Sequence, residues 1–170
     1  MQKKPAGKPL VVPSETDLAW AAGIIDGEGC IMVCYNGSSS ARDARYYQVR
    51  LVVTNTNAPL IRRLRMFFGG SIAKCKKAKA SYRQKAQWSL TGTLCVEGLR
   101  QVLPYLVSKA PEAELAIQVG DTILRRGNYK HVNGWFEYEA ISKKRAEIRA
   151  DIQRLKRTEY SYEDFVKEAF

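Results

Sequence analysis

One segment of the chain, residues 18–29, constrains the fold more than any other. Read as a helix, it gathers three small residues and one acid on one face: Ala19, Ala22, Gly23 and Asp26. Bulky apolar residues cover most of the rest of the helix. Small residues at this spacing allow the backbone of another helix to come very close. Because the chain has no second segment of this kind, we expect the same helix of a second copy to be that partner.

Two acids, Asp26 and Glu28, follow at the carboxyl end of this helix, which we expect to span about residues 15–26 and to be stopped by Gly27 and Gly29. Carboxylates are disfavoured at this end of a helix dipole by about 0.3–1 kcal/mol each. Two copies side by side would concentrate these acids, and such a cluster needs cations. A divalent-metal site and an ordinary buried helix with solvated acids remain equally open from these residues alone.

The overall charge narrows the class of partner. Lys and Arg total 28 against 17 Asp and Glu, which gives a net charge of +11, and 45% of the residues are hydrophobic, enough for a real core. A surplus of this size indicates a polyanionic partner, either nucleic acid or an anionic membrane surface. No apolar run approaches the roughly 20 residues that span a bilayer, so nucleic acid is favoured and no membrane partner is expected.

The basic N-terminus has no apolar signal-peptide core. We therefore expect an intracellular protein, in a bacterial cytoplasm or in an organelle such as a mitochondrion or chloroplast. The cysteines, Cys30, Cys34, Cys75 and Cys95, include no C-x-x-C pair, and the single histidine, His131, lies far along the chain. A zinc site is not expected. Buried or half-buried thiols in a reducing compartment are the favoured interpretation.

Hydrophobic periodicity predicts an α+β fold with an αββαββα core, a four-stranded antiparallel sheet and additional C-terminal helices. The predicted elements are helix 15–26, strands 30–35 and 46–54, helix 60–68, strands 71–76 and 87–91, and helices 94–103, 113–124 and 137–157. We divide the chain into a flexible arm (1–13), a core (14–125) and a C-terminal helical extension that packs on the core (126–170). A sheet of this kind has one face covered by helices and one open face.

The open face is the expected nucleic-acid surface. Its predicted members alternate with buried residues along the strands: Met32, Cys34, Tyr46, Gln48, Arg50, Cys75, Lys85, Gln87 and Ser89. Neighbouring loops are expected to add Asn36, Arg42, Arg45, Lys76, Lys77, Lys79 and Arg83. Such a face can enter a major groove and read base edges, while its basic rim neutralises phosphates. A solvated sheet face is the alternative, and the net charge favours contact with nucleic acid.

Residues 21–29, Ala-Ala-Gly-Ile-Ile-Asp-Gly-Glu-Gly, resemble the nine-residue motif for which the LAGLIDADG homing endonucleases are named. The departures of note are Ala21 in place of Leu and Glu28 in place of the final Asp, both ordinary in that family. The strand that ends before Asn55 and the segment 103–106 that precedes Lys109 also look like the family's core. The resemblance covers roughly residues 14–125.

The resemblance implies a single-motif homodimer formed through the motif helices, with Ala19, Ala22, Gly23 and Asp26 at the dimer interface. It implies three catalytic residues: Glu28, which binds the metal with help from the Gly27 carbonyl, Asn55, which positions the attacking water, and Lys109, which stabilises charge near the scissile phosphate. Taken alone, Asn55 fits a helix cap and Lys109 a surface residue.

A further basic residue that often follows shortly after the position of Asn55 in this family is not evident here, because Pro59 stands near its place. Arg62 or Arg63 would have to replace it.

The function implied is that of a homing endonuclease, encoded within an intron, that cleaves both strands of a long pseudo-palindromic DNA target by metal-dependent phosphodiester hydrolysis. Mg²⁺ is the expected cofactor, Mn²⁺ is expected to substitute, and Ca²⁺ is expected to bind without supporting cleavage. The alternative is a non-cleaving nucleic-acid-binding protein of the same fold, either a maturase that binds intron RNA or a DNA-binding regulator. A structural RNA-binding protein would explain the charge alone and leave the two-faced helix unaccounted for.

Overall fold

The computed structural model of the protein describes residues 7–36, 46–77, 79–124 and 135–157. Within these ranges, helices and strands follow the predicted order. The helices are α1 (Glu15–Glu28), α2 (Ala58–Phe68), α3 (Gly92–Val102), the short 3-10 helix η1 (Leu103–Tyr105), α4 (Ala110–Leu124) and α5 (Trp135–Leu155). The strands are β1 (Gly29–Asn36), β2 (Tyr46–Asn55), β3 (Ser71–Lys74) and β4 (Ala86–Thr91).

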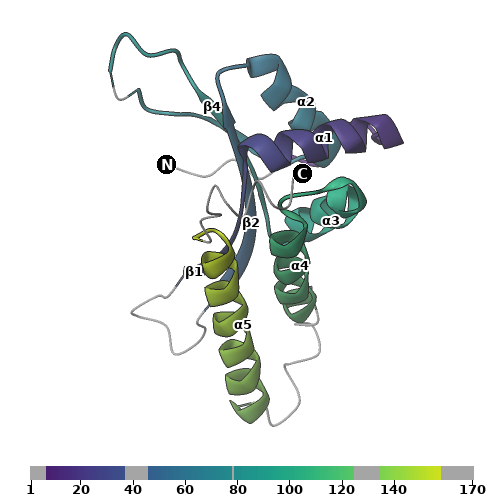
Figure 1. Cartoon of the computed structure of the whole chain (residues 1–170), viewed down its shortest axis with the longest axis vertical. Helices are drawn as coiled ribbons and strands as arrows, with labels where there is room; N and C mark the ends of the chain where they lie inside the picture. The colour runs from purple at the N-terminus through teal and green to yellow at the C-terminus, as the bar shows by residue number, and fades with distance from the viewer. Residues whose placement is uncertain (1–6, 37–45, 78, 125–134, 158–170) are drawn as a thin grey trace, which may run out of the picture.

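The four strands form one antiparallel sheet in the order β1-β2-β4-β3. The two hairpins meet where β2 pairs with β4, with Leu51 opposite Leu90 and Val53 opposite Trp88. Helices α1 to α4 lie on one side of the sheet, and the β3–β4 hairpin extends away from them (Figure 1). This arrangement confirms the predicted α+β fold with its αββαββα core and additional helices.

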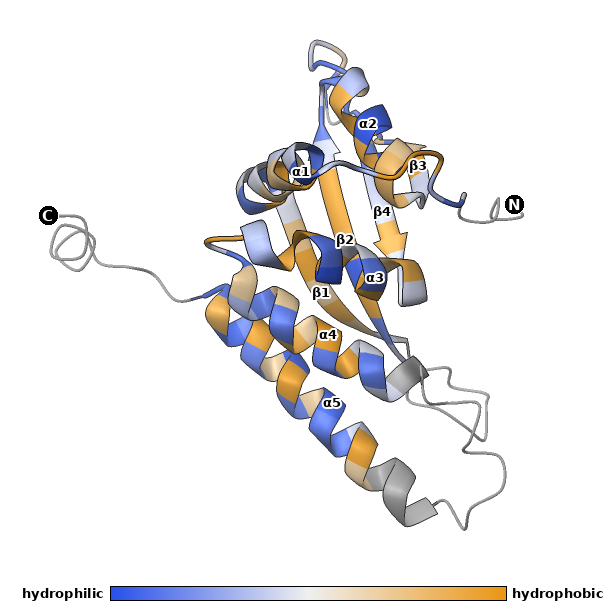
Figure 2. Cartoon of the chain, turned by 90° about the vertical axis from the view of Figure 1, so that its right-hand side faces the viewer, coloured by the Kyte–Doolittle hydropathy of each residue, from blue (hydrophilic) through white to orange (hydrophobic). Residues whose placement is uncertain are grey.

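The hydrophobic core lies between the sheet and these helices. Along β2 the predicted alternation is confirmed, because Tyr47, Val49, Leu51 and Val53 are all buried. Figure 2 shows β2 as a hydrophobic strand beneath the helices. Trp88 is fully buried and donates its indole N–H to the Gly69 carbonyl at 2.8 Å, so that its one polar atom is satisfied. Burial of each large apolar side chain contributes about 1.5–3 kcal/mol.

Helix α1 begins as predicted. Ser14 is its N-cap, and a capping box joins Ser14 to Asp17, each accepting a hydrogen bond from the main chain of the other. The predicted end of the helix was wrong, because α1 continues through Gly27 and Glu28, and only Gly29 caps it. Glycine is a poor helix former by about 1 kcal/mol but does not by itself end a helix.

Other boundaries differ from prediction by one to three residues, and two of these differences have a clear local cause. Helix α4 begins at Ala110 rather than residue 113, because Pro111 lies in its first turn, where a missing N–H costs nothing. Strand β3 ends at Lys74 rather than residue 76; a last main-chain bond from Cys75 to Lys85 (3.0 Å) follows before the hairpin opens into its tip.

The described part of the predicted N-terminal arm, residues 7–13, makes main-chain hydrogen bonds to the core. Gly7 and Gly70 exchange two main-chain hydrogen bonds of 3.1 and 2.8 Å, and Leu10 donates to Met66 at 2.8 Å. This contact needs glycine at position 69, where φ is +73° and a Cβ would lie 2.3 Å from the Gly7 carbonyl oxygen.

Helix α5, the described part of the C-terminal extension, lies beside α4 and the edge strand β1 (Figures 1 and 2). Ile148 and Ile152 bury their side chains in this contact. Lys156 directly follows α5 and links this end of the helix to the sheet, because its ammonium group donates to the Ile31 carbonyl and lies 3.3 Å from the Cys30 sulfur. None of the helices described has the length and apolar character needed to cross a membrane.

Candidate active site

The turn between α1 and β1 determines where Glu28 lies. Gly29 packs so closely on the preceding helical turn that a Cβ there would come within 2.5 Å of the Ile25 carbonyl oxygen. Its N–H donates to that same carbonyl, which closes the helix, and its extended backbone starts the strand. Glu28 is therefore the last helical residue, and its side chain is exposed at the junction between helix and sheet.

Lys109 is brought to the same junction from more than 80 residues away. It lies between η1 and the start of α4, and its main-chain N–H donates to Asp26 Oδ1 at 2.9 Å. Its ammonium group donates to the main-chain carbonyl of Asp26. A cation at the carboxyl end of α1 is favourable, since the carbonyl groups there carry the negative end of the helix dipole.

The register of the sheet brings Asn55 to this end as well. Gly29 pairs with Val53, so Asn55 lies two residues beyond that pair, on the side where α1 ends. Its Oδ1 accepts the Asn57 N–H at 2.8 Å, which forms a turn. The N-cap of α2 is Asn57, whose Oδ1 accepts the Leu60 N–H at 3.2 Å. The alternative of Asn55 as the cap is thus wrong.

Asp26 lies beneath this group and is fully engaged within its own chain. Its Oδ2 accepts the Val107 N–H at 2.8 Å, and its Oδ1 accepts the Ser108 hydroxyl at 3.1 Å in addition to the Lys109 N–H. Burial raises the pKa of the Asp26 carboxyl, but the donors of residues 107–109 together lower it more, so its pKa lies below the ordinary 3.8. The carboxylate is therefore charged at neutral pH.

Arg63 does not supply the missing basic residue of the site. Its guanidinium pairs with Asp17 at 2.6 Å and lies 4.6 Å above the centre of the Trp20 ring, in a cation–π contact. Asp17 is in the first turn of α1, three turns from Glu28, so this cluster stabilises the opposite end of the helix. Arg62 is exposed on α2.

Polar side chains line the face of the sheet opposite the core. The predicted Met32, Cys34, Gln48, Arg50, Gln87 and Ser89 all lie on this face and are partly exposed. Two hydrogen bonds cross it: Arg50 donates to the Ser89 hydroxyl at 3.4 Å, and Gln87 donates to the Thr54 hydroxyl at 3.3 Å. These bonds hold donors and acceptors in fixed positions, which suits a surface that reads another molecule.

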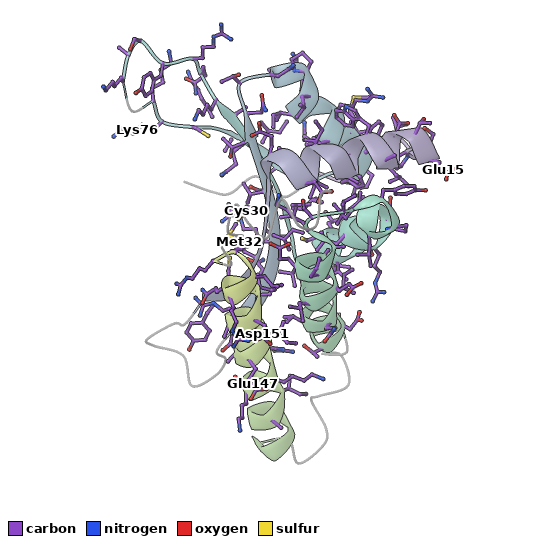
Figure 3. All side chains as sticks on the ribbon, viewed as in Figure 1. Glu15, Cys30, Met32, Lys76, Glu147 and Asp151 are labelled. Carbon is purple, nitrogen blue, oxygen red and sulfur yellow. The ribbon has the colours of Figure 1, made fainter. Side chains whose placement is uncertain are left out.

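Basic residues gather on the β3–β4 hairpin. The predicted Lys76, Lys77, Lys79, Arg83 and Lys85 are all exposed there, and Cys75 is partly exposed at its base. Gln84 closes the base by donating to the Cys75 and Lys85 carbonyls at 2.7 and 2.9 Å. Figure 3 shows Lys76 on this hairpin, away from the helices.

Other predicted contacts lie outside the described residues: all of Arg42 and Arg45, and the side chains of Asn36 and Tyr46.

The family profile described as LAGLIDADG endonuclease matches residues 21–109, which is more than half of the chain and includes Glu28, Asn55 and Lys109. The chain belongs to the LAGLIDADG endonuclease family. No curated protein matches it.

Solved structures of LAGLIDADG homing endonucleases share the fold. I-CvuI, in complex with the I-CreI target DNA and 2 mM Mg, has a TM-score of 0.65 at 18% identity, covering 90% of this chain and 92% of that one. The archaeal intron-encoded enzyme I-Vdi141I, complexed with DNA, has a TM-score of 0.62 at 14% identity, with 87% of each chain covered. I-SmaMI bound to cleaved DNA has a TM-score of 0.56 at 20% identity; 95% of this chain covers 49% of that one.

The exposed face of the LAGLIDADG helix differs in part from the predicted dimer face. Ala19 and Gly23 are exposed, as required, and Gly27 continues their four-residue spacing. A Cβ added at Gly23 or Gly27 would meet nothing within 4 Å, so this stripe is open. Ala22 is 0% exposed in the core, and Asp26 is bonded to residues 107–109, so their assignment to the outer face was wrong.

The residues at the end of the LAGLIDADG helix fit a hard divalent cation. The Ile25 carbonyl accepts the Gly29 N–H, and the Asp26 carbonyl accepts the Lys109 ammonium. The next main-chain carbonyl along the helix is that of Gly27, which can join the Glu28 carboxylate in binding a cation. Mg²⁺ and Ca²⁺ prefer such oxygen ligands. Within the described residues, no three His, Cys, Asp or Glu side chains cluster.

Sequence reasoning missed several residues of the open face. The register shows that Cys30, Val52, Thr54, Ser71, Ala73 and Thr91 share it with the predicted residues. Thr54 and Thr91 could have been found by extending the period of two to the strand ends. Ser71 and Ala73 follow by the same period of two from the predicted Cys75, although β3 has only four residues, all exposed, and its burial pattern defines no face.

Proposed function

We propose that two copies of this chain form a site-specific endonuclease that cleaves both strands of a long DNA target with Mg²⁺. The observation that carries the proposal is the convergence of Glu28, Asn55 and Lys109 at one end of the sheet. These residues come from a helix end, a strand end and a helix start. A carboxylate, an amide and an ammonium group beside a basic face are the groups that phosphodiester hydrolysis needs.

The open face of the sheet supports double-stranded DNA as the substrate. It presents Gln48, Arg50 and Gln87, which can pair with base edges in the major groove, and the basic hairpin can neutralise phosphates. I-CvuI and I-Vdi141I, which share the fold, were solved with DNA. Because each copy reads one half-site, the target is expected to be pseudo-palindromic.

The outer stripe of α1 supports a homodimer. Ala19, Gly23 and Gly27 let two helix backbones approach closely. The chain covers nearly all of the I-CvuI chain but only about half of the I-SmaMI chain, so the longer chain has room for two units of this size. Contact through α1 would bring the Glu28 residues of both copies together.

Mg²⁺ would be held by Glu28 and the Gly27 carbonyl, and the chemistry it supplies in such a site is polarisation of the phosphate and activation of water. Structures of I-CvuI with DNA were obtained with Mg and with Ca. Asn55 would orient the attacking water through its side-chain amide. Lys109 would stabilise the negative charge that develops on the phosphate. We expect Mn²⁺ to substitute, and Ca²⁺ to bind without supporting cleavage.

A non-cleaving protein of the same fold, such as an intron RNA maturase or a DNA-binding regulator, is the second candidate. One observation favours it: Arg63 is engaged with Asp17 and Trp20, and Pro59 offers no charge, so the basic half of the site is reduced. Retention of both Glu28 and Lys109 favours the endonuclease, since a pure binder gains nothing from a carboxylate beside phosphates. An intracellular, intron-encoded origin belongs to either proposal.

The test is cleavage of DNA by the purified chain. Duplexes bound in Ca²⁺ are selected from a randomised library, and the recovered sequence is placed in a plasmid. With Mg²⁺ the wild type is expected to linearise the plasmid. The Glu28→Gln variant keeps the size of the side chain and loses its charge. It is expected to cut the plasmid at least about 100-fold more slowly and still to bind the DNA.

Two results would count against the proposal. Tight binding by the wild type with no nick under Mg²⁺ or Mn²⁺ would favour the second candidate. Full cleavage by Glu28→Gln would remove Glu28 from the site.

A further inference from the structure

Asp26, the first acid of the motif, has no part in the proposed chemistry, yet it makes more side-chain contacts than Glu28. Both of its carboxylate oxygens are used, and all three donors come from one short segment, residues 107–109. Charge-assisted hydrogen bonds of this kind are about twice as strong as neutral ones. The contacts join positions 81 to 83 residues apart in the chain.

We propose that Asp26 is the positioning residue for Lys109, holding the segment 107–109 against the end of α1 so that the Lys109 ammonium stays beside Glu28. The inference rests on the proposed endonuclease function. It assigns Asp26 a role inside its own chain.

The contacts fix Lys109 at both ends. Its main-chain N–H is held by the Asp26 carboxylate and its ammonium group by the Asp26 carbonyl, so one residue holds both the base and the tip of a flexible side chain. A lysine has four methylene groups and about 2 kcal/mol of rotamer entropy, and it is not held in place without such partners.

The segment has few other anchors. Val107 is 85% exposed, and residues 107–109 lie between η1 and α4, outside any helix or strand. The preceding anchor is Leu106, whose side chain is buried and whose N–H donates to Leu103 at 3.2 Å. Without the Asp26 carboxylate, the bonds that remain to Lys109 are that of its ammonium group to the Asp26 carbonyl and that of its own carbonyl, which accepts the Ala113 N–H at 3.0 Å. Neither of them holds the N–H groups of the segment 107–109. A displacement of about 1 Å at a reacting group can cost about 100-fold in rate.

The experiment is a double-mutant cycle between Asp26→Ala and Lys109→Ala, with cleavage rate at saturating DNA and Mg²⁺ as one readout. DNA affinity in Ca²⁺ is the second. The third is hydrogen exchange of the peptide that spans residues 104–112, which needs no activity. Asp17→Asn is the matched control, since Asp17 also accepts a main-chain N–H and lies on the same helix, at its other end.

Asp26→Ala is expected to lower the cleavage rate about 100-fold with DNA affinity within a few fold of wild type, and to speed exchange at Val107 and Lys109. Lys109→Ala is expected to show a similar loss of cleavage rate. The double variant is expected to be little slower than either single variant, because both substitutions remove the same contribution of Lys109. Asp17→Asn is expected to keep the cleavage rate. Should Asp26→Ala fail to fold, Asp26→Asn is measured instead. Asparagine keeps the shape of the side chain and loses one of the two oxygens that accept main-chain N–H groups.

Multiplied rate losses in the double variant, or unchanged exchange in residues 104–112, would overturn the proposal. So would an equal loss in the Asp17→Asn control, which would indicate general weakening of α1. Wild type and Glu28→Gln are measured in parallel. If the wild type cuts no DNA, the proposed function fails, and the exchange readout still decides whether Asp26 holds the segment.

Discussion

Three residues of the candidate site owe their positions to three different causes. Glu28 is placed by the tight turn at Gly29, Asn55 by the register of β1 and β2, and Lys109 by hydrogen bonds to Asp26. Only the first cause is local in the sequence. The site therefore forms only when the sheet and the start of α4 are both in place.

The basic hairpin gives a prediction for single residues. Lys76→Gln removes one exposed charge near the expected DNA backbone, so the slope of log K against log salt concentration is expected to fall by about 0.9, with weaker binding to all sequences alike. The measurement is DNA affinity in Ca²⁺ over a range of salt.

Arg100→Gln is the control. Arg100 lies on α3, on the helical side of the sheet, and pairs with Asp121 of α4 at 2.5 Å. An equal change of slope in both variants would show that the hairpin has no special role.

The motif spacing predicts Glu28 as a metal ligand from local features alone, because the helix, its end and the acid lie within a dozen residues. The same pattern assigned Asp26 to the dimer face and did not predict its contacts within the chain. The partners of Asp26 lie more than 80 residues later, and nothing in residues 107–109 indicates a carboxylate between them. A residue's role in a tertiary contact is visible only once both sides of that contact are placed.

At the level of elements, α1 has distinct surroundings on each side. Ala21, Ala22 and Ile25 are buried against the core, while the stripe Ala19–Gly23–Gly27 is exposed. The sequence predicted two faces but misplaced their border by one residue, because small residues occupy both the buried side and the open side. Size alone does not distinguish a buried alanine from an exposed one.

The junction of α1 and β1 is tested by Gly29→Ala. The added Cβ would lie 2.5 Å from the Ile25 carbonyl oxygen, so we expect a loss of about 1–3 kcal/mol in the free energy of unfolding, measured by urea denaturation. Gly23→Ala is the matched helix variant, with open space at the Cβ, and is expected to be unchanged or more stable by up to about 1 kcal/mol. Equal stability of Gly29→Ala and wild type would show that the turn tolerates a side chain.

The start of α1 makes stability depend on pH. Hydrogen bonds from Ser14, followed by Arg63, hold the pKa of Asp17 below its ordinary 3.8. The stabilisation is thus present above the ordinary pKa and is lost as the pH falls through the lowered one. We expect Asp17→Asn to be less stable than wild type at pH 7 and the two to converge in acid, as measured by thermal unfolding. A difference that persists below pH 2 would contradict this account.

The bounds of a strand were predicted well where one face is apolar and the other polar, and poorly where the two faces are alike. Residues 46–54 alternate clearly, and β2 matches that span within one residue. The order β1-β2-β4-β3 was not predictable, because main-chain hydrogen bonds between strands leave no pattern in the sequence. The central position of β2 explains why Val52 is buried on the face opposite the core, between its neighbours on β1 and β4.

At the scale of the whole molecule, the proposed function needs two copies of the chain. The stripe on α1 is uncovered by the chain's own described residues, and the proposed contact through it would bring two Glu28 side chains together. The sheet offers one reading surface, which suits one half-site of a symmetric target. The proposed cleavage of both strands requires that two chains meet through α1 on the DNA.

The number of chains bound per duplex tests this claim most directly. Native mass spectrometry of the wild type with its selected duplex in Ca²⁺ is expected to give two chains per DNA. Gly23→Leu, which has room within its own chain but blocks close helix contact, is expected to stay folded and to lose that stoichiometry. One wild-type chain per duplex at saturation, or two chains per duplex in the Gly23→Leu variant, would contradict the account.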